Sequence, residues 1–591
     1  MRTGFPAEGF LRHRGLILVA VGGAVAEGGL LTLLAPGARP VAPQVTAAPS
    51  IAAYHDLRWL FTDSHSWVWF AGLLAVVLIL RSALDVVLLR LAWPSELPAP
   101  RPSRSFASCA ALTALAWLLL TPAVTLAFGV AVLPFSWPFL AAFPIMLGIL
   151  VALSHGGTVQ AWWRRLPPLR AVGWLLASFV ALTAAGALIA HLPTWEALPV
   201  IALGGLVNAR VLYGLALIAA QLRPRAHETV PARLLFSLPF APIAAVLVVA
   251  LVVGVARLMF TGTIVLPASV TGGSSAAAST VAGRTATTTG GSALTPVADS
   301  TASAVGAAAS AGGRPAASVA VLVVGGWGSS CCGDTAGLRA ALPGVMVRQF
   351  SYLGLAANGT PLPSGPDDDD LPLPALGDRI ARQVEALHAA SHKPVDVVAE
   401  SEGTLGVYAM LDRHPGLPVG AVVLLSPIVE PGQLSYPPGP DDASVSEYAL
   451  NELNYLIGSI SPFGPDGAAD LLDSVSEFGA RYFASAAAHL GAGGDPIHWL
   501  AVVPLADAVT LPVCGLPTDV QVVPALHGGL LGDPSVLPMV AEFVSGHEIP
   551  DASDSQLRDD AELITGAATA WRMPVTSTSC PGQANDRLGP G

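Results

Sequence analysis

Residues 395–404, VDVVAESEGT, give the clearest indication of the fold of the second half of the chain. A short β-branched run ends at Ala399, Ser401 follows, and a glycine then opens a run of helix-forming residues. This order predicts a strand, a sharp turn and a helix, with Ser401 at the turn. In the G-x-S-x-G nucleophile elbow, small flanking residues let strand and helix approach each other, and the serine hydroxyl projects at the helix N-terminus. Ala399 replaces the first glycine and is small enough for this turn.

Short apolar strands alternate with helices on both sides of this turn. The predicted strands are 319–324, 345–351, 395–399, 419–425, 499–505 and 520–525, and the predicted helices include 374–391, 402–413 and 534–546. This alternation is typical of a parallel sheet of about six strands with helices on both faces. Residues 433–495 interrupt it, and they fit a helical cap over the site and an ordinary surface insertion equally well.

Polar residues after the late strands complete a candidate site. A nucleophilic serine needs a base within hydrogen-bonding reach, and the base needs an orienting carboxylate. His527 follows the last predicted strand and Asp507 follows the one before it, at the edge where active sites of such sheets lie. We therefore predict Ser401 as nucleophile, His527 as base and Asp507 as orienting acid. The alternatives for the acid are Asp519 and Glu430, and the histidines in less suitable places are His388, His392, His414 and His498.

Backbone amides are the expected donors to a developing oxyanion. One is the amide of Glu402, directly after the serine. The second is expected from the loop GGWGSSCC after the first strand, at Trp327 or, as the next choice, Gly326. No G-K-[ST] follows this loop, so a nucleotide site is not expected. Glu400 and Glu402 flank the serine, and we expect both carboxylates to point away from the reacting carbon.

Six segments together resemble the α/β-hydrolase superfamily over residues 319 to about 546. They read VLVVGGWGSS, FSYLG, VDVVAESEGT, LLSP, PLADAVTLP and LHGGLLGDP. The nearest likeness is to small lipases and esterases, some of which share the A-x-S-x-G form of the elbow. Gly325 stands where the common H-G oxyanion signature has histidine. The resemblance implies a Ser401–His527–Asp507 triad and an acyl-enzyme. No cofactor is expected, and no metal either, because no spacing of His, Cys and Asp suggests a zinc site.

The first half has the composition of a membrane protein. Of the 591 residues, 53% are hydrophobic and 12% charged, and the mean hydropathy is +0.60. Seven apolar runs are long enough to span a bilayer. They are 15–34, 67–89, 107–132, 137–153, 171–190, 197–221 and 234–260. Arginines gather in alternate connections, so the positive-inside rule places the N-terminus in the cytoplasm and everything after the seventh span outside it. The membrane half resembles no family.

The two halves differ in charge and are joined by a segment of low complexity. Residues 1–317 hold 19 Arg and 9 acids, a net of +10, whereas residues 318–591 hold 10 Lys or Arg and 32 acids, a net of −22. An acidic second half argues against nucleic-acid binding. Residues 266–317 are almost wholly Ala, Ser, Thr, Gly and Val, which predicts a disordered tether. The predicted units are therefore 1–265, 266–317, 318–550 and a C-terminal extension, 551–591.

Three further groups of residues carry predictions. Four cysteines lie in the exported half, and we expect Cys331 and Cys332 each to pair with Cys514 or Cys580. The run of four aspartates, 367–370, is expected to be solvated rather than to bind metal. The polar residues at membrane depth are Glu27, Arg81, Asp85, Asn208 and Arg210. Arg81 and Asp85 are predicted to pair along one helix face, and Glu27 and Arg210 to pair between helices.

These observations predict an integral membrane serine hydrolase that cleaves carboxylic esters or thioesters. The membrane setting favours lipid-like substrates presented at the plasma membrane. Two other classes of function stay open. The exported half is alternatively an acyltransferase that serves an acceptor of the cell envelope. Alternatively, the membrane half is a transporter or a sensor, and the hydrolase-like half is catalytically silent.

Overall fold

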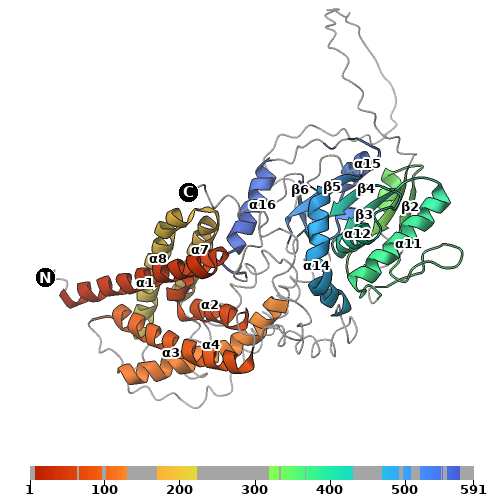
Figure 1. Ribbon diagram of the computed structural model, residues 1–591. Coiled ribbons are helices and arrows are strands. Elements are labelled where there is room, and N and C mark those ends of the chain that lie inside the picture. The colour runs from red at the N-terminus through yellow and green to blue at the C-terminus, as the bar shows by residue number, and fades with distance from the viewer. Residues whose placement is uncertain are drawn as a thin grey trace, which may run out of the picture.

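The computed structural model describes the two halves of the chain as a helical region and an α/β region (Figure 1). The described residues are 7–62, 66–95, 101–129, 169–221, 319–329, 331, 335–365, 368–429, 469–490, 497–507, 520–547, 549 and 555–572. The predicted spans 137–153 and 234–260 lie outside these residues, as does the predicted tether 266–317. So does most of the predicted cap.

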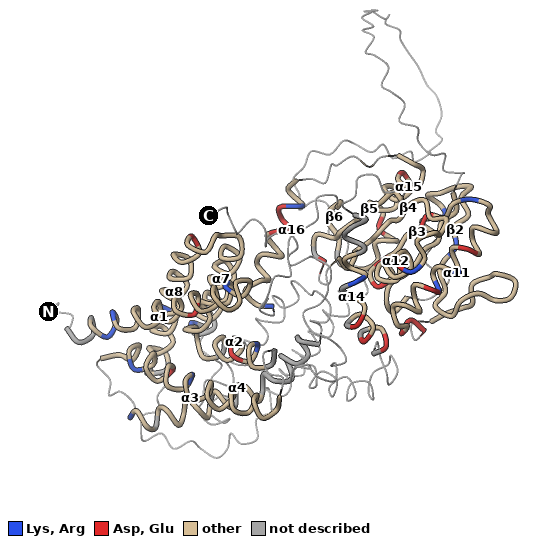
Figure 2. Tube along the Cα trace, viewed as in Figure 1, with Lys and Arg blue, Asp and Glu red and all other residues tan. Residues whose placement is uncertain are grey.

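Long apolar helices dominate the first half. The elements are α1 (Ala7–Leu34), η1 (Pro36–Thr46), α2 (Pro49–Thr62), α3 (Trp67–Ala92), α4 (Pro102–Gly129), α7 (Leu169–His191) and α8 (Thr194–Gln221). Four of the described helices are long and apolar enough to cross a membrane, namely Leu11–Leu34, Trp67–Ala92, Gly173–His191 and Thr194–Ile218. They correspond to four of the seven predicted spans. The predicted span 107–132 falls in α4, where a shorter apolar stretch, Ser105–Leu118, is found. Charged residues are sparse along these helices (Figure 2).

Small residues let the helices of this region pack closely. A Cβ atom on Gly205 of α8 would lie 2.8 Å from the carbonyl oxygen of Ala20 in α1, and one on Gly28 would lie 2.8 Å from Ile201. Such backbone proximity is typical of helix pairs in membranes, where packing rather than water exclusion drives association. Helices α1 and α8 accordingly share one of the most extensive contacts in the region.

The connection between the first two spans is folded back onto the helices. Asn208 Nδ2 of α8 donates to the carbonyl of Pro43 at 2.6 Å, and Thr46 Oγ1 donates to the carbonyl of Ala20 at 3.1 Å. Arg81 of α3 binds both carboxylate oxygens of Asp56 in α2, at 2.7 and 2.5 Å. The polar residues at membrane depth therefore hold η1 and α2 in place.

Both predicted ion pairs of this region are wrong. Arg81 pairs with Asp56 of the connection and not with Asp85, one turn along its own helix. Glu27 Oε1 lies 3.6 Å from His55 Nε2 rather than near Arg210. The guanidinium of Arg210 instead lies over the ring of Trp174, 4.6 Å from its centroid. The predictions failed because they considered only charged residues of the spans, whereas Arg81 and Glu27 find their partners in the short connection and Arg210 lies over an aromatic ring.

A six-stranded parallel sheet forms the centre of the second half. Its strands are β1 (Ala320–Val324), β2 (Met346–Gln349), β3 (Val395–Glu400), β4 (Val419–Leu425), β5 (His498–Ala506) and β6 (Val520–Leu526), in the order β2-β1-β3-β4-β5-β6. All pairs are parallel, and Val398 of β3 aligns with Val323 and Val423 of its two neighbours. The fold class predicted for this half, a parallel α/β sheet, is confirmed, and so is the predicted number of strands.

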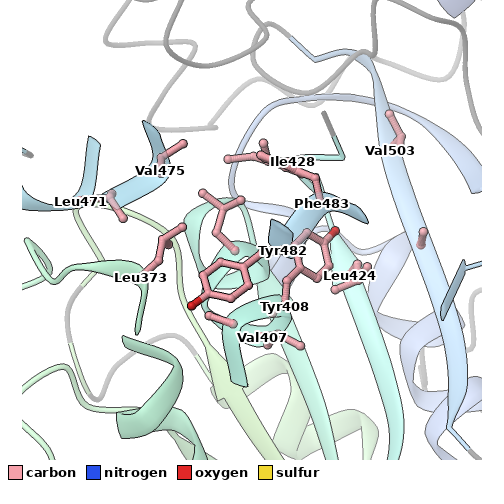
Figure 3. Packing of buried hydrophobic residues seen from close by; sticks show 14 of the residues in the cluster. Leu373, Val407, Tyr408, Leu424, Ile428, Leu471, Val475, Tyr482, Phe483 and Val503 are labelled. Carbon is pink, nitrogen blue, oxygen red and sulfur yellow. The ribbon is translucent and has the colours of Figure 1, made fainter. Parts of the chain in front are cut away.

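Helices cover both faces of the sheet because its strands are apolar on both sides. The helices are α10 (Ala336–Ala341), α11 (Leu373–Ser391), α12 (Glu402–Arg413), α14 (Ala469–Leu490), α15 (Val536–Val544) and α16 (Ser555–Ala568), with the short η6 (Leu530–Gly532). In β1, Leu322 packs in the cluster with α11, α12 and α14, and Val323 in the cluster with α10 and α15. Figure 3 shows Tyr408 of α12 and Phe483 of α14 packed in the first cluster.

Candidate active site

Ser401 lies at a strained turn between β3 and α12. Its backbone has φ 53° and ψ −119°, a conformation that residues with a side chain rarely adopt. Its amide donates to the carbonyl of Leu425 at 2.9 Å, which ties the turn to β4. A Cβ atom on Gly403 would lie 2.8 Å from the carbonyl oxygen of Gly325, so a glycine is needed where α12 passes β1. The chain therefore forms the sharp turn that the sequence predicts, with the serine at its apex.

Three side chains from three strand ends form one hydrogen-bonded chain. Ser401 Oγ lies 2.8 Å from His527 Nε2, and His527 Nδ1 lies 2.9 Å from Asp507 Oδ1. Asp507 is fully buried, and His527 is 4% exposed. Because β3, β5 and β6 are parallel, their carboxyl ends meet at one edge of the sheet. The structure thus brings together the three residues that the sequence singled out as nucleophile, base and acid.

The electrostatic surroundings of His527 favour its charged form. Burial alone would lower the pKa of its imidazole, but the charge of Asp507, its hydrogen bond and the more distant charge of Glu400 outweigh that effect. The pKa of His527 is therefore raised above its ordinary value of 6.5. An imidazole held this way accepts a proton readily and is stabilised as imidazolium.

We find no match to this chain among protein-family models, curated proteins or solved structures. A serine, an imidazole and a carboxylate in this geometry recur on unrelated folds, where they are recognised by distance and role. The chemistry of the site therefore rests on the contacts of its own residues.

The glycine loop after β1 lies directly against the serine. A Cβ atom on Gly326 would lie 2.9 Å from Ser401 Cβ and 3.5 Å from its Oγ. Trp327 follows with 43% of its surface exposed. On the other side of the serine, Glu402 is the first residue of α12, and the amides of a first helical turn have no partner within the helix. Gly326 therefore borders the serine side chain and Glu402 follows it in the chain, as donors of an oxyanion site require, and Trp327 is next to Gly326 in the loop.

The two glutamates beside the serine are held by other groups. Glu400 Oε1 accepts the amide of Leu530 at 2.7 Å, in the loop that follows His527. Glu402 is buried, and its Oε2 accepts the hydroxyl of Tyr352 at 3.4 Å. Burial, reinforced by the nearby charge of Asp369, raises the pKa of Glu402 well above its usual range. The raised pKa favours the protonated form of Glu402, which adds no negative charge beside the serine.

Asp369 connects the acidic run to the glycine loop. Its Oδ2 accepts the amide of Gly328, and the side chain is 2% exposed. The neighbouring residues of the run also bind backbone amides, since Asp368 accepts from Gly365 at 2.7 Å and Asp370 accepts from Leu471 at 3.2 Å. The expectation of a merely solvated run is therefore wrong for these three. The sequence could not reveal their partners, which lie up to 101 residues away.

Tyr352 is a second group at the site that was not singled out. Its hydroxyl donates to the carbonyl of Gly325 at 3.0 Å and contacts Glu402. Tyr352 therefore contacts both the glycine loop after β1 and the residue that follows the serine. It lies in the FSYLG segment, directly after β2. A buried tyrosine among apolar neighbours is the only sequence signal for this role, and many core tyrosines share it.

The other candidate residues lie elsewhere or outside the described part. His388 Nδ1 contacts the carbonyl of Lys393, His392 caps α11, His414 pairs with Asp378, and His498 begins β5. Asp519 and Glu430 lie outside the described residues, as do Cys332, Cys514 and Cys580, so the predicted disulfides stay predictions. Within the described ranges, no three His, Cys, Asp or Glu side chains are grouped as a metal site needs.

Proposed function

We propose that the chain is a membrane-anchored serine hydrolase of the α/β-hydrolase type, which cleaves carboxylic esters or thioesters. One observation carries the proposal: Ser401, His527 and Asp507 form a continuous hydrogen-bonded chain, with the serine on a strained turn at the edge of a parallel sheet. A structural serine needs neither a buried imidazole–carboxylate pair nor a backbone held in a costly conformation.

The proposed reaction begins with attack of Ser401 Oγ on the substrate carbonyl. His527 Nε2 takes the serine proton, and the carbonyl oxygen becomes an oxyanion facing the amides of Glu402 and Trp327. The tetrahedral intermediate collapses as the imidazolium returns the proton to the leaving alcohol or thiol. This leaves an acyl-enzyme on Ser401. A water molecule, deprotonated by His527, then releases the carboxylic acid and restores the serine.

Asp507 fixes the tautomer and orientation of the imidazole in this scheme. Its Oδ1 accepts the hydrogen bond from Nδ1–H, so Nε2 is left as the acceptor that faces Ser401. Complete burial of Asp507 strengthens this interaction, because little water screens it. Support for lipid-like substrates comes from the attached membrane helices, four of which are apolar enough to cross a bilayer.

Covalent labelling with a fluorophosphonate probe tests the proposal. Membranes containing the full chain should label, and Ser401→Ala should abolish the label because the phosphonate bonds to an activated serine. Ser426→Ala is the matched control, because Ser426 is a buried serine with positive φ that follows the neighbouring strand β4. A correctly folded wild-type protein that takes no label would contradict the proposal and favour a silent ectodomain.

A further inference from the structure

The residues after α16 lie inside the helical half of the molecule. Trp571 is fully buried, and its ring stacks on Phe179 of α7 with centroids 5.0 Å apart and an interplanar angle of 26°. Its indole N–H donates to Thr183 Oγ1 of the same helix at 2.8 Å. A buried tryptophan with a satisfied N–H contributes strongly to an interface. We call residues 569–572 the C-terminal segment.

Three polar side chains of η1 and α2 bind the backbone of this segment. Tyr54 donates its hydroxyl to the carbonyl of Trp571 at 2.7 Å, and Arg58 donates to the carbonyls of Arg572 and Ala570 at 2.8 and 3.1 Å. Gln44 Nε2 also donates to the carbonyl of Ala570. Carbonyls outside regular structure need such partners when they are buried. Gln44, Tyr54 and Arg58, with Phe179, Thr183 and Gly186, form what we call the socket.

The socket fits the segment without spare room. A Cβ atom on Gly186 would lie 2.5 Å from Ala570 Cβ, and Thr569 Oγ1 lies 3.4 Å from the carbonyl of Gly186. Arg58 is 1% exposed, and the segment supplies two of its acceptors. Without the segment, these donors would lose charge-assisted hydrogen bonds in a buried place, which is unfavourable. The socket is therefore suited to a turn of peptide backbone at the end of a helix that carries one aromatic anchor.

Helix α16 connects the segment to the sheet. It packs against β5 and β6, and Arg558 Nη2 donates to the carbonyl of Val520 at 3.3 Å. One hydrophobic cluster runs from the sheet through Ala561 and Trp571 to Leu57 and Leu182 in the helical half. Figure 1 shows α16 between the two halves. The strands that α16 contacts, β5 and β6, directly precede Asp507 and His527.

We propose that the C-terminal segment is an intramolecular docking element, which binds the socket and fixes the sheet half on the helical half. The tether predicted for residues 266–317 would by itself allow a reach of about 40 Å. The docked segment adds a second attachment, and its position in the same chain raises its effective concentration to roughly the millimolar range. The candidate active site then keeps one position relative to the membrane. This inference stands whether or not the site is catalytic.

Cleavage of the predicted tether, residues 266–317, tests whether the docked C-terminal segment holds the sheet half on the helical half. A protease site inserted after Gly290 is cut in membranes that contain the full chain, and the membranes are then washed. The sheet half of the wild type should remain with the membranes and should co-purify with the helical half in mild detergent. Trp571→Ala should release it, because the anchor is lost. Gly186→Leu should also release it, because the leucine fills the place of Ala570 and leaves the sheet half unaltered.

The cleavage experiment needs a control for the effect of placing a leucine in helix α7. Gly173→Leu is the control for Gly186→Leu, because Gly173 lies on the same helix with open space around its Cα and should not affect retention. Release of the wild-type sheet half on cleavage would overturn the proposal. So would equal retention of wild type, Trp571→Ala and Gly186→Leu, which would mean that another surface holds the sheet half. Retention is read by immunoblot and is independent of hydrolase activity.

Discussion

At the scale of single residues, the candidate site depends on the protonation of two buried groups. His527 must be neutral to accept the serine proton, whereas Glu402 must be protonated to leave the oxyanion region uncharged. Burial and a nearby carboxylate act on both groups: Asp507 raises the pKa of His527, which opposes its neutral form, whereas burial and Asp369 raise the pKa of Glu402, which favours its protonated form. His527 therefore favours activity at pH values above its pKa, whereas Glu402 favours activity at pH values below its own pKa.

The first prediction concerns the acidic limb of the activity profile. Because only neutral His527 acts as a base, kcat/KM should rise with pH through the raised pKa of this histidine, so the midpoint should lie above 6.5. Asp507→Asn removes the charge that raises this pKa and the acceptor that fixes the tautomer. We expect kcat to fall by about 10⁴-fold, and we expect the acidic limb of the remaining activity to have its midpoint at a lower pH. Hydrolysis of a short-chain ester as a function of pH measures both, and an unchanged midpoint in the variant would contradict the assignment.

The second prediction concerns the pH dependence of stability. Since the pKa of Glu402 is raised in the folded protein, its protonated form stabilises the fold below about 4.5, the ordinary value, and this contribution is lost as pH rises through the raised pKa. Glutamine keeps the shape and does not ionise. The melting temperature of the wild type should therefore fall relative to Glu402→Gln as pH rises. A constant difference between the two proteins from acidic to alkaline pH would show that Glu402 titrates normally.

A third prediction follows from the contact between Asp369 and the glycine loop. Asp369→Asn weakens a charge-assisted hydrogen bond to the amide of Gly328, worth about 1.5–3 kcal/mol. The loop should lose its position, and we expect kcat to fall about 10- to 100-fold with little change in KM. Asp368→Asn is the control, because Asp368 binds Gly365 instead. Equal effects of the two substitutions, or a change in KM alone, would argue against positioning of the loop by Asp369.

At the scale of elements, close backbone approach decides where helices and strands lie. Gly403 brings α12 against β1, and Gly205 brings α8 against α1. In each case the neighbouring atom is a backbone carbonyl, which has no rotamer by which to move away. Larger residues at these positions therefore force whole elements apart.

The fourth prediction concerns the close contact between helices α1 and α8 at Gly205. Gly205→Leu should separate α1 from α8 and lower the melting temperature of the chain in detergent, because the new side chain meets the backbone of Ala20 and Val21. We expect a loss of about 1–3 kcal/mol or more. Gly72→Leu is the control, since a side chain on Gly72 of α3 meets open space. If both variants melt like the wild type, the close contact of α1 and α8 does not contribute to stability.

At the scale of the whole molecule, the docked C-terminal segment bears on topology. Its partners Tyr54 and Arg58 lie in the connection between the first two spans, and its partner Thr183 lies just past the middle of α7. The positive-inside rule places that connection outside the cytoplasm. A sheet half attached there belongs on the same side, which supports the proposed extracytoplasmic location.

The fifth prediction follows from this placement. A membrane-impermeant protease added to intact cells should cut a site inserted after Gly290, and an epitope tag after residue 591 should be accessible without permeabilisation. A tag placed before Arg2 should require permeabilisation. Access to both tags from the same side would contradict an odd number of spans between them, and therefore the seven that the sequence predicts.

Local pattern was sufficient to predict the parallel sheet and the residues of the site. The short apolar strands of the second half were recognisable because each is bounded by turn residues, and their carboxyl ends had to meet at one edge. Ser401, His527 and Asp507 were identifiable because each directly follows such a strand. In the second half, the strand and helix limits differ from the predicted ones by at most two residues, as at β1 and α11.

Which distant groups meet depends on the folded arrangement of the whole chain. The parallel sheet, the apolar helices and the polar residues at the strand ends are predictable without it, because they depend on periodicity and on short-range turn chemistry. The partners of Arg81, Asp369 and Trp571 lie 25, 41 and 388 residues away, and no local pattern encodes them. Long-range polar contacts of this kind arise when folding buries a donor or acceptor that must then be satisfied by whichever element lies opposite.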